Sequence, residues 1–295
     1  MPTKDFGKVF HNVFDPELSY TNTAAFHNSI PRGKNITSYL TDTSLWNRIN
    51  GTNGYKLFED LFIGDYIVVG DNTYVIADFD YYIRCGSVDI TAHHLIMVPA
   101  AGMSIPAGTA LYGASGTLTL LDGESATAKK WNPSNSTAGG YKFSRMRQTI
   151  MKAANTIVIN AFGAAHVLPI TVLYPNPSNA TESGLASGWT WFADDSQTSD
   201  TCKSICDLLN ETQVYGQQVW GQGSAFGNMG YEVGTDKFQL SIFALDRAFA
   251  DIRATWWLRS VASATGAALV RNYGFANGAG ASNALGVRPR FLLVG

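Results

Sequence analysis

Residues 256–260 read WWLRS and residues 286–291 read GVRPRF, and these two motifs near the C-terminus decide the fold. Apolar side chains in and beside them alternate with other residues at strand spacing, which predicts burial on paired strands. The side chains concerned are Trp256, Leu258, Val287, Phe291 and Leu293. Arg259 and Arg288 lie beside these apolar positions, so we expect carbonyl or carboxylate partners for them. Between the motifs, residues 260–285 are almost wholly small or polar, which predicts a displayed loop on a rigid base.

The loop at 260–285 is the candidate binding surface of the chain. It is rich in Ser, Asn and Gly and holds two aromatic residues, a composition typical of adaptable binding loops. The side chains expected to point outward are Ser263, Thr265, Arg271, Asn272, Tyr273, Phe275, Asn277 and Asn283. Tyr and Arg are the usual anchors of interfaces, so Arg271, Tyr273 and Phe275 are expected to contribute most. The alternative is a glycine-rich surface loop without a partner.

The middle of the chain predicts further strands. Residues 62–69 (FIGDYIVV) and 72–79 (NTYVIADF) are rich in β-branched and aromatic residues, and the Gly-Asp pair between them indicates a hairpin. Residues 94–99 (HLIMVP) are a third candidate strand, and residues 100–130 are expected to contain an inserted hairpin. The remaining short strands are expected at 189–192, 238–245, 256–259, 267–271 and 287–294.

Two helices complete the expected fold. The first begins with Ser144 as its N-cap and ends at Gly163, because apolar residues between them step by three and four positions. The second is expected near 200–210, where two cysteines and two aliphatic residues share one stripe. Helices inserted between β-rich ends predict an α+β domain over 41–295, with a twisted antiparallel sheet and much irregular loop. Residues 1–40 have no sustained period and are expected to form an extended arm, used for attachment or lying on the domain.

Composition excludes several classes of protein. Only 15% of the 295 residues are charged and the net charge is −2, so capture of nucleic acid by a basic surface is not expected. The longest apolar stretches, such as residues 95–103, are far too short to span a membrane. The N-terminal stretch MPTKDFGKVFHNVFDPEL carries acids and no apolar segment, so we expect no secretory signal and synthesis in the cytoplasm of a host cell.

No pattern of catalytic or metal-binding residues stands out. The sequence lacks a nucleophile elbow, an HExxH motif, a phosphate-binding loop and a dinucleotide fingerprint. Cys202 and Cys206 could form half of a metal site, form a redox pair, or pack as small hydrophobic side chains on a buried face. The last interpretation is favoured. The acidic pair Glu59-Asp60 lacks the spacing of a calcium loop and is expected in a solvated turn. We therefore expect no enzyme activity, no metal and no cofactor.

Several motifs carry a resemblance to a known family. The pair WWLRS and GVRPRF, with AALVRNYG between them, is similar to the C-terminus of phage and prophage proteins with a C-type-lectin-like fold, the variable proteins of diversity-generating retroelements. Upstream, IGDYI, YVIADFD, HHLIMVP, WNPSNSTAGGY, SRMR and VYGQQVW resemble the body of the same family, so the similarity covers residues 45–295 approximately. The resemblance implies a C-type-lectin-like body whose final loop contacts a host receptor.

The resemblance also implies a place and partners for the protein. It would be a bacteriophage virion protein, exposed on the particle in a tail fibre, a baseplate or a head fibre. It would recognise a bacterial surface receptor that is a protein or a glycan. Such domains are often displayed as homo-oligomers, for example trimers, and the arm at 1–40 would bind other virion proteins. The main alternative is a head-decoration or cement protein without receptor binding, and a further one is an enzyme of the formylglycine-generating type.

Two departures from related proteins bear on these alternatives. A calcium-dependent sugar lectin needs carboxylate and amide ligands near its terminal strands, and residues 252–295 contain no carboxylate side chain. Formylglycine-generating enzymes use cysteines late in their fold, whereas the last cysteine here is Cys206. The sequence therefore favours a non-enzymatic binding or structural protein.

Overall fold

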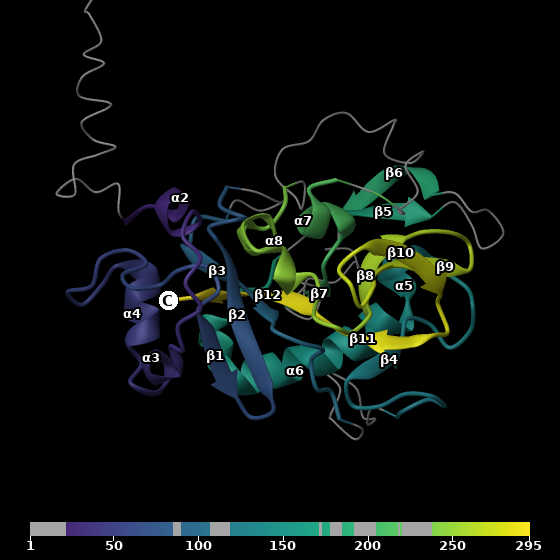
Figure 1. The fold of residues 1–295 in the computed structure, drawn as a ribbon, viewed down its shortest axis with the longest axis horizontal. Coiled ribbons are helices and arrows are strands. Elements are labelled where there is room, and N and C mark those ends of the chain that lie inside the picture. The colour runs from purple at the N-terminus through teal and green to yellow at the C-terminus, as the bar shows by residue number, and fades with distance from the viewer. Residues whose placement is uncertain are drawn as a thin grey trace, which may run out of the picture.

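The computed structural model describes residues 22–84, 90–106, 119–170, 173–177, 185–191, 205–217, 219 and 238–295 of the chain. Within them the protein is a mixed α+β body with two five-stranded sheets, a two-stranded hairpin and mostly short helices (Figure 1). One hydrophobic core contains residues of both large sheets. The expected α+β class is confirmed.

The first sheet has the strand order β1-β2-β3-β12-β7, and its neighbouring strands are antiparallel. Its members are β1 (Tyr66–Val69), β2 (Asn72–Phe79), β3 (His94–Pro99), β12 (Pro289–Val294) and β7 (Asp207–Leu208). The hairpin expected at 62–79 is confirmed, because β1 and β2 pair around a turn at Gly70. The φ of Gly70 is 57°, a left-handed conformation that glycine adopts without strain.

The second sheet has the strand order β10-β9-β8-β11-β4. Its members are β4 (Ala128–Lys130), β8 (Trp256–Val261), β9 (Gly266–Val270), β10 (Ala276–Gly280) and β11 (Ala284–Gly286). β11 runs parallel to β8 and meets it where Gly286 lies opposite Trp256. A Cβ atom on Gly286 would lie 3.1 Å from the Thr255 carbonyl oxygen and 3.2 Å from the Trp256 Cβ, so the close approach of these strands favours glycine.

The GVRPRF motif connects the two sheets, because β11 lies in the second sheet and β12 in the first. Between the two strands Val287 and Arg288 are fully buried. The Arg288 guanidinium donates hydrogen bonds to the carbonyl oxygens of Pro99 (3.0 Å) and Phe249 (2.7 Å). Its central carbon lies 4.6 Å from the ring centroid of Trp256. The carbonyl partners expected for Arg288 are confirmed, and they hold the connection in place.

The long helix starts as a π-helical turn, η2 (Met146–Ile150), and continues as α6 (Met151–Phe162). At its start, the Ser144 hydroxyl accepts a hydrogen bond from the Arg147 backbone N–H at 3.1 Å, as expected for a capping serine. At its end, Gly163 has a φ of 84°. The first expected helix is therefore confirmed, with a π-helical first turn that the apolar spacing did not indicate.

Helix α6 packs on the first sheet. The ring centroid of Phe162, at its last turn, lies 5.4 Å from that of Tyr74 on β2 and 5.5 Å from that of Phe291 on β12. The other helices and helical turns are α2 (Ala24–His27), α3 (Thr37–Thr41), α4 (Ser44–Asn50), α5 (Gly140–Phe143), η3 (Ala164–His166), α7 (Glu211–Tyr215), α8 (Ser241–Leu245) and η6 (Arg247–Phe249).

The second expected helix is wrong in its described part. Residues 205–210 are not helical: β7 pairs there with β12, and α7 begins only after Asn210, which forms a capping box. The Cys206 backbone N–H donates to the Asn155 side-chain oxygen at 2.8 Å, and this contact joins the segment to α6. Tertiary partners therefore override the helical spacing of the apolar residues. Cys202 lies outside the described residues.

The strand expected at 238–245 is also wrong, because its second half is helix α8. The backbone N–H and the hydroxyl of Ser241 both donate to the Asp78 carboxylate at 2.8 Å, so a side chain of β2 satisfies a free N–H at the helix start. Of the hairpin expected within 100–130, residues 107–118 lie outside the described residues, and the end of the segment forms β4. The strand expected at 189–192 is part of β6 (Leu185–Trp191), which pairs with β5 (Leu173–Pro177).

The described part of the expected arm, residues 22–40, lies on the body. It contains α2 and the start of α3, and it makes parallel β-bridges from Pro31 to Ile63 and from Asn35 to Tyr66. Ile36 is fully buried in the core. Residues 1–21 of the arm lie outside the described residues.

Candidate functional site

The loop expected at 260–285 is largely a hairpin. β9 and β10 pair antiparallel from Gly266↔Gly280 to Val270↔Ala276. The turn that joins them, residues 271–275, is called the tip below. It is closed by hydrogen bonds from the Gly274 N–H to the Arg271 carbonyl (2.8 Å) and from the Arg271 N–H to the Phe275 carbonyl (2.9 Å). The strand expected at 267–271 is confirmed as β9, whereas its antiparallel partner β10 was not expected within the displayed loop.

Gly274 sets the shape of the tip. Its φ is +78°, as in hairpin turns that close with a left-handed residue. A Cβ atom at this position would lie 3.2 Å from the backbone nitrogen of Asp251 and 3.3 Å from its Cβ. The Tyr215 hydroxyl, at the end of α7, donates a hydrogen bond to the Gly274 carbonyl at 3.1 Å. The tip therefore rests on the body at two places.

The tip presents the three side chains expected to contribute most. Arg271 is exposed, Tyr273 is 63% exposed and Phe275 is 52% exposed. Asn272, between them, is half-buried. Large apolar rings are unfavourable in water unless they meet a partner, so two such rings on one turn mark a candidate contact surface.

Three of the other candidate residues lie at the opposite end of the hairpin. Ser263 and Thr265 are in the β8–β9 turn, and Asn283 follows β10. Thr265 and Asn283 are exposed, and Ser263 is half-buried. Arg271 lies six residues beyond Thr265 along β9, so the two ends are about 20 Å apart, at about 3.4 Å per residue. The eight candidates therefore form two separate groups, with the half-buried Asn277 on strand β10 between them.

The end opposite the tip is braced by residues 132–137, which belong to the WNPSNSTAGGY motif. Thr137 donates from its hydroxyl to the Ser263 carbonyl (2.6 Å) and from its backbone N–H to the Ala264 carbonyl (2.9 Å). The Asn135 side-chain oxygen accepts from both the N–H (3.0 Å) and the hydroxyl (2.7 Å) of Ser282. These contacts occupy backbone groups of the turn, so this end serves as an anchor for the hairpin.

The strands that carry the hairpin have a buried and largely apolar base. The five side chains expected on paired strands are all buried, at 0% exposure, which confirms that prediction: Trp256, Leu258, Val287, Phe291 and Leu293. Arg259 is buried as well. Trp257, also fully buried, donates from its indole nitrogen to the Lys129 carbonyl at 2.9 Å. The base is therefore held by packing against both sheets.

A groove of about 770 Å³ opens beside the tip, between the tip, α7, α8 and the segment 247–251. Its walls include the aromatic side chains of Tyr215, Phe243, Tyr273 and Phe275 and the polar side chains of Gln217, Gln239, Arg247 and Asp251. Sequence reasoning identified only the two tip aromatics. The others come from segments far apart in the chain, and no local pattern indicates that they meet.

Asp251 holds an unusual position in the groove. Its Oδ1 atom is enclosed and, among the described residues, has no hydrogen-bond partner. The nearest cation is Arg253, whose Nε lies 3.7 Å away, beyond hydrogen-bond distance. The guanidinium of Arg253 also lies 5.7 Å from the ring centroid of Tyr273. The enclosed oxygen therefore has Arg253 as its nearest compensating charge, while the Asp251 side chain as a whole is 31% exposed and lines the groove.

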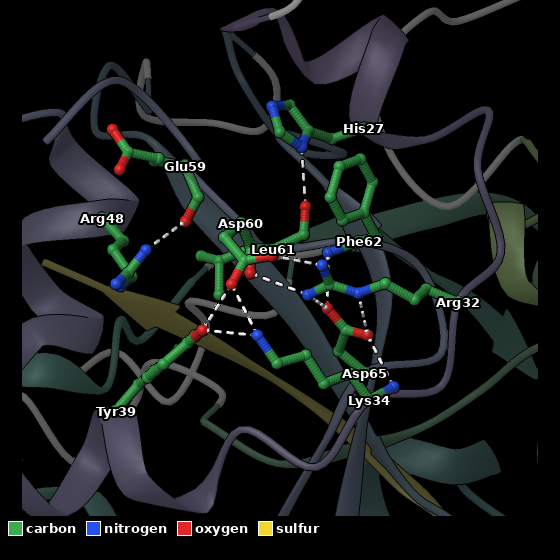
Figure 2. Close-up of polar contacts among 10 residues, drawn as sticks. All are labelled: His27, Arg32, Lys34, Tyr39, Arg48, Glu59, Asp60, Leu61, Phe62 and Asp65. Atoms are coloured by element: carbon green, nitrogen blue, oxygen red, sulfur yellow. Dashed lines mark hydrogen bonds and ion pairs between the residues drawn. The ribbon is translucent and has the colours of Figure 1, made fainter.

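A second polar cluster joins the N-terminal segment to the loop at 58–65 (Figure 2). Arg32 donates two hydrogen bonds to the buried Asp65 carboxylate, at 3.0 and 2.6 Å. It also pairs with Asp60, which in turn accepts from Lys34 (2.6 Å) and from the Tyr39 hydroxyl. Burial acts to raise the pKa of Asp60, but these three donors hold it well below its usual range. The turn expected around Asp60 is present and its side chain is 37% exposed, and the structure adds that its charge is paired within this network.

The described residues contain no group of three or more His, Cys, Asp or Glu side chains that could hold a metal ion. The adjacent histidines have structural contacts. His93 lies 2.7 Å from the Asp80 carboxylate, and the buried His94 ring accepts from the Tyr82 backbone N–H at 3.0 Å. Cys206 is buried as a free thiol, and burial raises its pKa, so it behaves as a small hydrophobe. None of the helices in the described ranges is long and apolar enough to cross a membrane.

Comparisons with protein-family models, with curated proteins and with solved structures found no match to this chain.

Proposed function

We propose that this protein is a bacteriophage virion protein with a C-type-lectin-like domain, which recognises the host surface through the tip at 271–275. The observation that carries the proposal is the exposure of Tyr273 and Phe275 on a hairpin that stands on fully buried side chains such as Trp256 and Trp257. Interfaces concentrate their binding energy in a few aromatic and Arg residues on rigid supports. The resemblance of the C-terminal motifs to phage variable proteins supplies the biological setting.

Rigid support is what separates this tip from an ordinary surface loop. The hairpin is anchored at one end by residues 132–137, and its tip rests on Tyr215 and Asp251 at the other. A preformed surface loses little conformational entropy when it binds. Three large side chains give a small contact area, so each copy would bind weakly. A homo-oligomer displayed many times on a virion would reach firm attachment through multivalency.

The rival proposal is a cement protein that stabilises the particle without contacting the host. Both proposals describe a binding protein without enzyme activity. They differ in what the tip contacts. In the first it meets a bacterial receptor, a protein or a glycan; in the second it meets a neighbouring subunit.

The test is a triple variant of the tip, Arg271→Ala, Tyr273→Ala and Phe275→Ala, incorporated into particles. The matched control is a triple variant of the anchored end, Ser263→Ala, Thr265→Ala and Asn283→Ala. Because the tip side chains are exposed, we expect unchanged folding and particle occupancy but at least tenfold slower host adsorption for the tip variant alone. Normal adsorption at full occupancy would refute receptor binding by the tip. Reduced occupancy or particle stability with normal adsorption would support the cement protein.

A further inference from the structure

We infer that the groove beside the tip binds an uncharged sugar chain of the host surface. The inference rests on the proposed function and names the chemical class of its receptor. It depends on three properties of the groove: aromatic walls, polar side chains and few charged groups.

The aromatic walls provide flat apolar surfaces. Tyr273 and Phe275 form part of one wall and are both more than half exposed, and Tyr215 lies across the base of the tip. A sugar ring presents C–H groups on its faces, and these carry the partial positive charge that an aromatic face attracts. Rings fixed on a closed turn are suited to this contact, because they do not have to be ordered when the ligand arrives.

The polar groups of the groove match the hydroxyls of a sugar. The Asp251 side chain lines the groove and is 31% exposed, so its carboxylate can accept a hydrogen bond from a sugar hydroxyl. Gln239 uses its amide nitrogen on the Val214 carbonyl at 2.8 Å, which fixes the orientation of the amide. Arg247 is exposed at the rim and supplies N–H donors. A sugar hydroxyl both donates and accepts, so it can serve all of these groups.

Few charged groups line the groove. Among the described residues that line it, Arg247 and Asp251 are the two charged side chains, and Arg253 lies 3.7 Å from the Asp251 carboxylate. A neutral ligand can use Arg247 as a hydrogen-bond donor and Asp251 as an acceptor without bringing a charge of its own. The volume of about 770 Å³ lies within the range of sites that enclose small ligands, so a short stretch of an oligosaccharide fits.

The first experiment measures binding of the intact protein to a panel of immobilised neutral oligosaccharides composed of hexoses and N-acetylhexosamines. We expect binding to at least one member and a tenfold or greater loss for Asp251→Asn and for Tyr273→Ala. Asp251→Asn keeps the shape of the side chain, and Tyr273 is exposed, so both variants should retain the melting temperature. Thr265→Ala, at the anchored end, is the control and should bind normally. Binding to no member of the panel, or equal binding by all variants, would overturn the inference.

The second experiment separates this inference from the proposed function. Host cells are treated with periodate, which cleaves sugar diols, or with protease, and adsorption of wild-type particles is compared. Loss after periodate but not after protease supports the inference. Loss after protease alone, together with slow adsorption of the tip variant, would overturn the sugar ligand and leave host recognition by the tip standing. Panel binding that Asp251→Asn removes, with normal adsorption of the tip variant, would retain the sugar site and refute the proposed function.

Discussion

The Tyr215 hydroxyl donates a hydrogen bond to the carbonyl oxygen of Gly274 at 3.1 Å, which ties α7 to the tip of the β9–β10 hairpin. Fifty-nine residues of sequence separate the two partners. This bond joins the element that displays the exposed aromatic rings to the body that supports them.

Tyr215→Phe should loosen the tip without unfolding the protein. Loss of this hydrogen bond should lower the free energy of unfolding by only about 1 kcal/mol. The tip, however, would lose one of the two contacts that hold it on the body. We expect slower host adsorption with a nearly unchanged denaturation midpoint. Tyr39→Phe removes a hydroxyl of similar kind in the N-terminal network and should leave adsorption normal. Equal adsorption by wild type and both variants would show that the Tyr215 bond does not position the tip.

Trp256→Ala should destabilise the fold strongly. The indole is fully buried between β8, the Arg288 guanidinium and the ring of Phe243, so its removal leaves a large cavity. The expected cost is about 3–5 kcal/mol in the free energy of unfolding, measured by denaturant titration. Phe143→Ala is the control, because that ring is 64% exposed and its loss should change stability by less than about 0.5 kcal/mol. Similar midpoints for both variants would contradict the packing described here.

Asp78 should make stability depend on pH between about 4 and 6. Burial raises the pKa of this carboxyl from 3.8 to about 6, against the opposing hydrogen bonds from Ser241 and Asn28. The folded state therefore holds its proton more tightly than the unfolded state does. The resulting stabilisation is complete below pH 4 and is lost as pH rises through 6, an effect of about 3 kcal/mol.

Asp78→Asn removes this titration, so the difference in unfolding free energy between wild type and variant should change with pH across that window. The measurement is denaturant unfolding at pH 4.5, 5.5, 6.5 and 7.5 for both proteins. Parallel pH profiles of the two proteins would show that the carboxyl of Asp78 titrates normally.

The two carboxylates of the N-terminal network should differ in their contribution to stability. Asp65 is buried and accepts from Arg32, from the Lys34 backbone and from the Phe62 backbone, so Asp65→Asn should cost about 3 kcal/mol. Lys34→Ala breaks a half-exposed ion pair with Asp60 and should cost at most about 1 kcal/mol, less at high salt. Limited proteolysis should then cut residues 22–40 first in the Asp65 variant. If Asp65→Asn and Lys34→Ala lowered the free energy of unfolding equally, the buried carboxylate would contribute no more to stability than the exposed ion pair does.

A chelator should leave both the melting temperature and host adsorption unchanged. The described residues hold no cluster of metal-binding side chains, and residues 252–295 contain no carboxylate side chain. The measurement is a thermal melt and an adsorption assay with and without EDTA. Loss of either property that calcium restores would indicate a lectin-type calcium site.

Local pattern was sufficient for the parts of the fold that depend on neighbouring residues. Alternation of apolar side chains identified the buried strands around Trp256 and Phe291, and the glycine turn identified the β1–β2 hairpin. The three- and four-residue spacing identified α6. Apolar residues at strand or helix spacing mark these elements within a short window of sequence, although β8 and β12 prove to be buried on both faces.

The same local rules were wrong where distant partners satisfy the backbone. Residues 205–210 have helical spacing but pair with β12, and the helix at Ser241 starts on the carboxylate of Asp78, over 160 positions earlier. Chain separation hides such partners from any local window. Propensity is a weak preference of less than about 1 kcal/mol per residue, so one strand pairing or one buried carboxylate overrides it.

The candidate site divides in the same way. Composition was enough to single out Arg271, Tyr273 and Phe275 as a surface suited to binding, because Arg and aromatic side chains contribute most of the binding energy at interfaces. The pairing register of β9 and β10 placed Ser263 and Thr265 at the far end, where they anchor the hairpin. Folding of α7, α8 and the segment at 247–251 against the tip made the groove, because a cavity exists only between surfaces that distant parts of the chain bring together.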